Sequence, residues 1–301
     1  MVDSLELSIG EGLPAASGVL YRTIQRLGMG GNAVTYLVVA ITGAAKGVPF
    51  ALKVFRRLSK PERRDAFLQE IEFLKTCEHP SIMRVFDTGV YHDEYPFVVA
   101  EYLPDTLRTV IARGTTPITP KIAYTLQLLS ALDYLANLAP AVVHRDIKPE
   151  NMFLKGHSCV LGDFGLMKRV GTPDAPDQTV LKESVGAGMP WSYRTPDLVT
   201  YYRREGPITS KSDIFQLGLV VAELFTGKNP LRPHKTFADP VELNRLSGVH
   251  GALAEPILDL IGHMLVIDPE DRDPAAKFVD AWQGVFFDAI ERAHALEGRV
   301  F

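Results

Sequence analysis

Cysteine is scarce in this chain of 301 residues, which limits the metal sites that it can hold. The two cysteines, Cys77 and Cys159, stand in no CxxC pair and in no Cys/His cluster with metal-ligand spacing. The spacing argues against a zinc site, and we expect two buried, reduced thiols.

Long apolar runs and a secretory leader are also missing. The most apolar stretch, over 217–225, is interrupted by Glu223 and falls short of the roughly 20 residues that span a bilayer. The first residues, MVDSLELSIGEG, are acidic where a secretory signal is basic. We therefore expect no membrane span and a cytoplasmic location.

No excess of one charge points to a nucleic-acid or membrane partner. The net charge is −4, and hydrophobic and charged residues make up 46% and 23% of the chain, which is typical of globular proteins. The length suffices for one large domain or for two lobes that share a cleft. We expect no nucleic-acid partner, and the composition indicates no oligomeric state.

The first part of the chain, to about Pro96, has the turns and short apolar runs of antiparallel strands. One strand ends at Leu27, the turn GMGGN follows, and further strands are expected over 35–41 and 50–55. Apolar positions at three- and four-residue steps predict one amphipathic helix over 61–77. Strands around 83–86 and 97–102 complete a small sheet.

From Leu103 on, the apolar periodicity becomes helical, with helices expected over 120–139, 210–225, 256–265 and 275–296. A short extended hinge at 103–105 joins the two parts. The fold class is therefore α+β: a small antiparallel β-sheet lobe with one helix, and a larger, mainly helical lobe. We divide the chain into an N-terminal extension, 1–18, and a domain, 19–301, with lobes over 19–103 and 104–301.

Two features of the first lobe are weak signals when each is taken alone. The glycine-rich turn lies between two strands, so it does not fit the dinucleotide fingerprint, and many such turns are only hairpins. Lys53 lies in an apolar strand, and Glu70 on the following helix is its natural counter-charge, although two unrelated surface charges are the alternative.

The strongest signal is the stretch HRDIKPEN, 144–151, followed by DFG, 163–165. Two carboxylates, Asp146 and Asp163, stand 17 positions apart with Asn151 between them, and Lys148 lies two residues past the first. These side chains supply the oxygen ligands and the base that phosphoryl transfer requires.

With these motifs in this order, residues 20–290 resemble the eukaryotic-type protein serine/threonine kinase family. Gly28 and Gly30 match its phosphate-covering loop, and FALK, 50–53, matches its V-A-I-K strand. SDIFQLG, 212–218, resembles the SDxWxxG helix start, and Asp268-Pro269 with Arg272 resembles the late DPxxR motif. The resemblance implies a bilobal kinase fold and transfer of the γ-phosphoryl group of ATP, with Mg²⁺ or Mn²⁺, to a protein Ser or Thr hydroxyl.

The resemblance also implies roles for the matched residues. Asp146 would accept the proton of the substrate hydroxyl, and Lys148, as in serine/threonine rather than tyrosine kinases, would neutralise charge on the γ-phosphate. Lys53 would hold the α- and β-phosphates and Glu70 would orient it. The implied magnesium ligands are Asn151 and Asp163, the implied ATP-site residues are Gly28, Gly30, Ala33, Thr35, Ala51, Lys53, Ala100, Glu101 and Leu103, and the implied structural residues are Asp197, Asp213 and Arg272.

The chain departs from the family pattern at several of these positions. Ala33 replaces the third glycine and Thr35 the valine over the adenine, so we expect an effect on nucleotide affinity. Thr195-Pro196-Asp197 replaces A-P-E, and we expect Asp197 to pair with Arg272. The small Ala100 is expected to open the back of the adenine pocket, unless neighbouring side chains fill the space.

The stretch 171–190 has no periodic apolar pattern, and such segments are usually functional or mobile. Arg145 and Lys168 are candidates to bind a phosphate there, on Thr172, Thr179 or Ser184, and unmodified hydroxyls are the alternative. Glu150 and Glu223 hold positions that contact an upstream substrate arginine in basophilic kinases, although both are common elsewhere in the family.

Two other classes of function stay open. A pseudokinase, or scaffold module, keeps the fold without turnover, and the intact set of catalytic side chains argues against it. A small-molecule kinase shares the lobes and both carboxylates but usually lacks Lys148 and the region around 195–197 and Arg272. Turnover of ATP, and transfer to a small alcohol, discriminate among the three.

Overall fold

The computed structural model describes residues 5–30, 33–56, 61–172, 191–231, 240–246, 249 and 251–297. These residues divide into two compact units, which we describe separately. Unit 1 comprises Met1–Glu78 and Ile82–Pro104, and unit 2 comprises His79–Ser81 and Asp105–Phe301. The sequence-based division at residues 18 and 103 stays a prediction.

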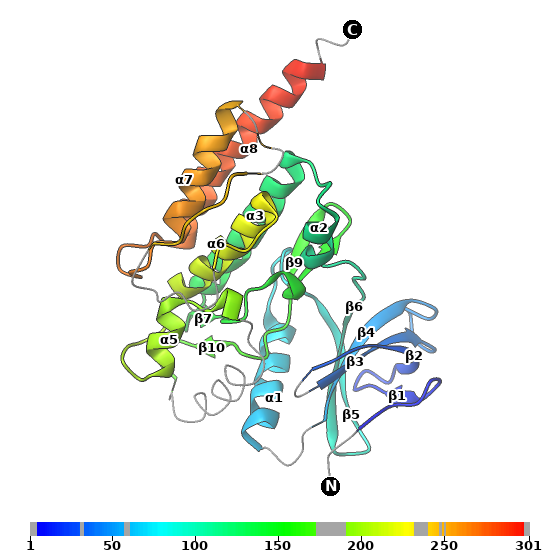
Figure 1. Cartoon of the computed structure of the whole chain (residues 1–301). Coiled ribbons are helices and arrows are strands. Elements are labelled where there is room, and N and C mark those ends of the chain that lie inside the picture. Colours follow the sequence, from blue (N-terminus) through cyan, green and yellow to red (C-terminus); the bar gives the residue numbers. More distant parts are fainter. Residues whose placement is uncertain are drawn as a thin grey trace. The chain divides into compact units, whose positions relative to one another are not determined.

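Unit 1 is an antiparallel sheet with one helix (Figure 1). Its described strands follow the spatial order β1-β2-β3-β4-β6-β5. The elements are β1 (Gly12–Pro14), β2 (Leu20–Met29), β3 (Ala33–Ala40), β4 (Pro49–Phe55), α1 (Pro61–Thr76), β5 (Val85–Tyr91) and β6 (Tyr95–Glu101).

The two faces of this sheet bury different partners, because side chains alternate along each strand. One face carries Val34, Leu52 and Val99 into a core that also contains Leu7 and Leu13. Part of the segment assigned to an N-terminal extension therefore packs into unit 1. On the other face, a second core contains Ala33, Phe55 and Val98 together with Phe67 and Ile71 of α1.

β5 differs from the strand that was expected over 83–86, since it begins at Val85 and continues to Tyr91. Asp87 and Gly89 read as strand breakers in the sequence. The Asp87 carboxylate is stabilised in this strand because it accepts hydrogen bonds from the Ser17 hydroxyl and the Thr88 N–H. The Ser17 contact joins residues 70 positions apart, so no local pattern reveals it.

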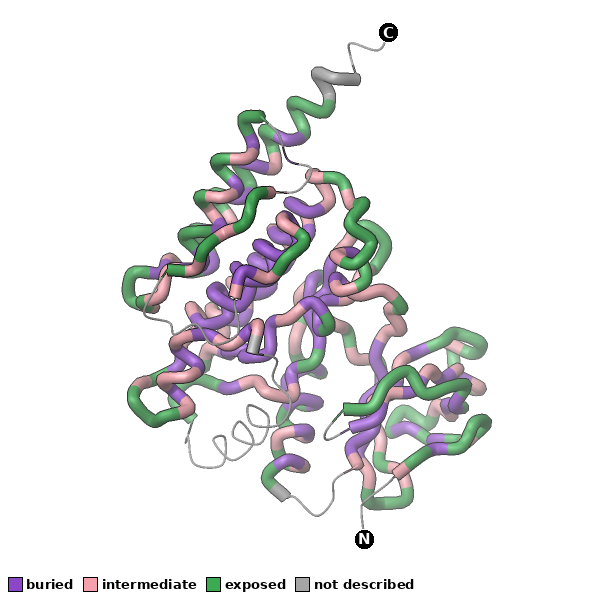
Figure 2. Tube along the Cα trace, viewed as in Figure 1, coloured by how far each residue is buried: buried purple, intermediate pink, exposed green. Residues whose placement is uncertain are grey.

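Unit 2 is built around α6 (Lys211–Thr226), in which every residue from Ser212 to Phe225 is buried (Figure 2). A Cβ at Gly218 would lie 3.0 Å from side-chain atoms of Met264 and Leu265, so the glycine permits the close approach of this chain segment. The surrounding long helices are α3 (Ile118–Ala136), α7 (Ala254–Met264) and α8 (Ala275–Glu297). All four long helices occur where the sequence predicts them, with ends shifted by a few residues.

The shorter elements of unit 2 include two helices that apolar periodicity does not predict, α2 (Leu107–Arg113) and α5 (Pro196–Tyr202). Capping chemistry marks both of them: α2 ends at Gly114 with φ 65°, and the Thr195 side chain at the start of α5 accepts the Leu198 N–H. The remaining elements are β7 (Val142–Val143), η1 (Pro149–Asn151), β8 (Met152–Lys155), β9 (Ser158–Leu161), β10 (Lys168–Arg169), η2 (Trp191–Tyr193) and η3 (Gly251–Leu253). None of the described helices combines the length and apolar character needed to cross a bilayer.

Candidate active site

The loop between β7 and η1 is fixed by a buried carboxylate of α6. The two oxygens of Asp213 accept the backbone N–H groups of His144 at 2.7 Å and Arg145 at 2.8 Å. Burial raises the pKa of Asp213 to about 7, although both backbone donors oppose this shift. Arg145 has φ 67°, an unfavourable conformation for a residue with a side chain. The hydrogen bonds to Asp213 hold the loop in this conformation.

The buried side chain of His144 makes two further hydrogen bonds that hold the same loop. Its Nε2 lies 3.1 Å from the Gly162 carbonyl and therefore donates, which leaves Nδ1 to accept the Asp146 N–H at 3.2 Å. Burial lowers the pKa of His144 to about 4, so the ring is neutral at physiological pH, as this bonding pattern requires. The ring also packs on Phe164, with centroids 4.5 Å apart.

Asp146 lies at the centre of the loop, where two side chains orient it. The Lys148 ammonium donates to both carboxylate oxygens, at 3.0 and 2.8 Å, and the Asn151 amide nitrogen donates to one of them at 2.9 Å. Burial raises the pKa of Asp146, with Lys148 opposing and Asp163 adding to the shift. A carboxylate that is buried, oriented and raised in basicity is suited to accept a proton.

Oxygen atoms that suit a hard divalent cation occur beside Asp146. Because the amide nitrogen of Asn151 donates to Asp146, its amide oxygen is the atom that would bind a metal. The Asp163 carboxylate is exposed, and its backbone φ of 58° is again left-handed. These donors fit Mg²⁺, which prefers oxygen and takes few ligands from protein when phosphates supply the others.

The predicted pair of Lys53 and Glu70 is present within unit 1. Lys53 Nζ on β4 lies 2.8 Å from Glu70 Oε1 on α1, and the Glu70 side chain is only 3% exposed. A buried carboxylate requires such a partner. The contact therefore fixes the ammonium above the sheet face that α1 covers.

The strand register places most of the implied ATP-site residues on that same face. Thr35 pairs with both Gly28 and Lys53, and Ala51 pairs with Ala100, so their side chains point to one side of the sheet. Glu101 ends β6, and Leu103 lies just before the end of unit 1. A Cβ at Gly28 would meet nothing within 4 Å, so the packing of the described residues does not itself require a glycine there.

Arg145 and Lys168, the two candidates to bind a phosphorylated hydroxyl, both contact the first residues after DFG. The buried Arg145 donates from Nε to the Leu166 carbonyl at 2.6 Å, and Lys168 Nζ donates to the Thr172 carbonyl at 3.1 Å. The Thr172 hydroxyl donates to the Arg169 carbonyl. Thr179 and Ser184 lie outside the described residues, and the regulatory role of all five candidates stays a prediction.

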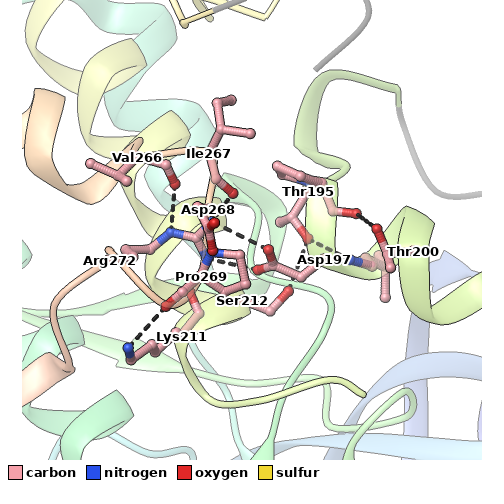
Figure 3. A network of polar contacts seen from close by, with 12 residues as sticks. Thr195, Asp197, Thr200, Lys211, Ser212, Val266, Ile267, Asp268, Pro269 and Arg272 are labelled. Atoms are coloured by element: carbon pink, nitrogen blue, oxygen red, sulfur yellow. Dashed lines mark hydrogen bonds and ion pairs between the residues drawn. The ribbon is translucent and has the colours of Figure 1, made fainter. Parts of the chain in front are cut away.

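The expected pair of Asp197 and Arg272 forms the centre of a buried polar network (Figure 3). The guanidinium donates to both carboxylate oxygens, at 2.7 and 3.3 Å, and both side chains are almost fully buried. Arg272 also donates to three backbone carbonyls, those of Lys211, Val266 and Ile267. Asp197 thus makes a bidentate contact although its side chain is one methylene shorter than the glutamate of the family pattern. The contact links α5 to the chain that precedes α8.

One residue near the loop was missed by the sequence reasoning. Arg108 on α2 donates to Glu150 at 2.7 Å and to Glu223 at 2.6 Å. Nothing in the local pattern of α2 marks this arginine, because its partners lie 42 and 115 positions away.

Comparison with known proteins shows the family to which the chain belongs. The family model "Protein kinase domain" matches residues 21–282. The chain is 30% identical over 226 residues to the serine/threonine-protein kinase pak-2 of Caenorhabditis elegans, covering 72% of the chain and 40% of that protein. It is 30% identical to cds1 of Schizosaccharomyces pombe over 270 residues, covering 84% of the chain and 55% of that protein.

A third relative is matched over most of its own length. The probable serine/threonine-protein kinase KIN28 homolog of Encephalitozoon cuniculi is 30% identical over 247 residues, which is 77% of the chain and 73% of that protein. The chain thus spans between 40% and 73% of the length of these three relatives. It belongs to the eukaryotic-type protein serine/threonine kinase family, and the resemblance read from its motifs is confirmed.

The Asp197–Arg272 pair gives a prediction about stability. Arg272→Met removes the guanidinium and leaves a buried carboxylate without its counter-charge, so we expect a loss of about 3–5 kcal/mol in the free energy of unfolding. Lys277→Met is the matched control, because it breaks the exposed pair with Asp273, at 2.7 Å, and should cost less than about 1 kcal/mol. Urea unfolding followed by circular dichroism measures both, and equal losses would contradict the assigned role of Arg272.

Proposed function

We propose that the chain is an active protein kinase that transfers the γ-phosphoryl group of ATP to a serine or threonine hydroxyl of a protein. The observation that carries the proposal is the orientation of Asp146 by Lys148 and Asn151 in a loop that Asp213 fixes. Family membership and the names of the relatives support the same reaction. A pseudokinase has no need of this arrangement, because it does not move a proton.

Each described side chain has a defined task in this reaction. Asp146 accepts the proton of the substrate hydroxyl and points that oxygen at the phosphorus, and Lys148 neutralises negative charge on the transferred group. Asn151 and Asp163 would supply oxygen ligands to a divalent metal, whose positive charge would neutralise charge on the phosphates of ATP. Lys53, held by Glu70, pairs with the α- and β-phosphates of ATP.

The serine/threonine preference rests on Lys148. Its ammonium contacts both oxygens of Asp146, in the position where the family pattern of serine/threonine kinases has a lysine. We expect the side chain to remain beside the short aliphatic hydroxyl during transfer. Matched peptides with Ser, Thr or Tyr as the only acceptor test this preference, and faster transfer to Tyr would contradict it.

Removing the base gives the direct test of the reaction. Asp146→Asn keeps the size of the side chain but cannot accept the proton, so transfer from radiolabelled ATP with magnesium should fall by about a hundredfold or more. Lys53→Ala should also lose most of the activity, and Lys277→Met, which changes only an exposed ion pair, should keep it. Intact-mass analysis and phosphosite mapping of the same samples report whether Thr172, Thr179 or Ser184 is modified.

Three outcomes separate the alternatives. Equal transfer by wild type and Asp146→Asn contradicts the proposal, and nucleotide binding without transfer in the wild type identifies a pseudokinase. Transfer to a small alcohol but to no protein identifies a small-molecule kinase.

Ala100 gives a prediction about inhibitors. Ala100 pairs with the equally small Ala51 on β4, so two adjacent strands carry only methyl groups at this point of the sheet. Adenine analogues with a bulky substituent should inhibit wild type at least about tenfold more strongly than Ala100→Met. Dose–response curves for ATP-competitive analogues measure the difference, with unsubstituted adenosine as the control ligand. Equal potency against the two proteins would show that neighbouring side chains already fill the space.

A further inference from the structure

The chain before β2 crosses one face of the unit 1 sheet as a strap, residues 5–17, which we call the N-terminal strap. Leu7, Leu13 and Ala15 of the strap are buried in the core on the face opposite to the one that carries Thr35 and Lys53. Within the strap, β1 pairs with β2. The strap is therefore a packed part of the sheet.

The strap binds both strands of the hairpin that carries the glycine-rich turn. On β2, the Arg26 guanidinium lies 2.8 Å from the Glu6 carboxylate. On β3, the buried Tyr36 hydroxyl accepts the Leu7 N–H at 2.9 Å. Arg26 and Tyr36 are themselves partners in the register of the two strands. Two consecutive residues of the strap thus hold one cross-strand pair of the hairpin.

A second set of contacts joins the strap to β2 at the buried Thr23. The Gly10 N–H donates to the Thr23 carbonyl at 2.9 Å, and the Thr23 N–H donates to the Glu11 carbonyl at 3.0 Å. The Thr23 hydroxyl donates to the Ser8 carbonyl. Thr23 is therefore bound through its backbone and its side chain.

These contacts coincide with the two places where the pairing of β2 with β3 is irregular. One irregularity lies between Thr23 and Gln25, and the other lies between Arg26 and Gly28. An irregularity of this kind bends a strand and changes its twist. Because the strap binds Thr23 and Arg26, it contacts the hairpin where the hairpin bends, and so it sets the direction in which the turn extends.

The pair held by the strap lies next to the residues implied to cover the phosphates. The next register pair toward the turn is Gly28 with Thr35, and the turn is closed by the Gly30 N–H, which donates to the Ala33 carbonyl at 2.8 Å. Thr35 points to the face opposite to that of Tyr36, because side chains alternate along a strand. The strap thus holds the hairpin from behind, one residue away from the implied ATP site.

The other end of the strap is anchored away from the hairpin. The Ala16 N–H donates to the Thr88 carbonyl at 2.7 Å, and the Ser17 hydroxyl donates to Asp87. Both partners lie on β5, which is the last strand of the sheet, whereas β1 is the first. The strap therefore joins the two edges of the sheet, and the hairpin is held against an anchored segment.

We propose that the N-terminal strap positions the glycine-rich turn for the phosphates of ATP, with Tyr36 as the positioning residue through which it acts. The inference rests on the proposed function and deepens it. The contacts of the strap exist before ATP binds, so they reduce the ordering cost that ATP binding would otherwise have to offset. Their loss should weaken the binding of ATP and leave the loop around Asp146 unchanged.

Tyr36→Phe tests the inference, because it removes the acceptor of the Leu7 N–H and keeps the ring in the core. By calorimetric titration, the Kd for ATP with magnesium should rise about threefold to tenfold, the effect of one hydrogen bond. The KM for ATP should rise by the same factor, while kcat at saturating ATP stays within about twofold of wild type. Adenosine, which has no phosphate, should bind equally to both proteins.

Two further variants make the result specific. Thr23→Val removes the hydroxyl that donates to Ser8 and keeps the shape of the side chain, so it should also weaken ATP binding. Tyr91→Phe is the matched control, because the Tyr91 hydroxyl donates to the Glu11 carboxylate of the strap, at 3.1 Å, from β5. It should bind ATP as wild type does. If thermal unfolding shows that Tyr36→Phe does not fold, Thr23→Val serves as the test.

The outcomes distinguish failure of this inference from failure of the proposed function. Equal Kd values for ATP in wild type, Tyr36→Phe and Thr23→Val overturn the inference alone. Equal losses of ATP and adenosine affinity in Tyr36→Phe also overturn it, since they indicate a general loosening of unit 1. A wild type that binds ATP but transfers no more phosphate than Asp146→Asn overturns the proposed function, and the Kd values still decide the inference. A wild type that binds no ATP overturns both.

Discussion

The active loop of this protein depends on two hydrogen bonds that one buried carboxylate accepts. Asp213 binds the N–H groups of His144 and Arg145, and Arg145 has a left-handed backbone that costs on the order of 1–3 kcal/mol. Two hydrogen bonds to a buried acceptor, each contributing about 0.5–1.5 kcal/mol, are enough to offset that cost. Because the turn at Arg145 comes directly before Asp146, the direction of the proposed base follows from Asp213.

The same helix connects the loop to the rest of unit 2. Although α6 is buried along nearly its whole length, it carries polar side chains, and each makes contacts with the chain around the loop or after residue 190. Gln216 accepts the Ile147 N–H and donates to the Tyr193 carbonyl, while Ser212 lies 2.9 Å from the Thr195 hydroxyl. Glu223 accepts hydrogen bonds from Arg108 of α2 and from the Tyr193 hydroxyl. A helix that is otherwise apolar therefore orients the base and joins the loop to the chain around it.

The sequence predicted what local patterns and short motifs encode. Strand and helix periodicity located the long elements. The motif at 144–151 located the loop, because this order of residue types is specific to one kind of site. What it could not predict depends on distant contacts. β5 accommodates Asp87 through a hydrogen bond from Ser17, and Arg108 forms an ion pair with Glu223, 115 positions away. The helices α2 and α5 were missed although their caps were readable, because both are too short for apolar periodicity.

Amide hydrogen exchange at His144 and Arg145 tests the central claim most directly, because it reports on the two hydrogen bonds themselves. In the wild type we expect both amides to be strongly protected. In Asp213→Asn, where an amide nitrogen replaces one acceptor oxygen, exchange at one or both should be about tenfold to a hundredfold faster, while amides in α3 stay unchanged. Equal protection of both amides in the two proteins would contradict the claim that Asp213 holds the loop.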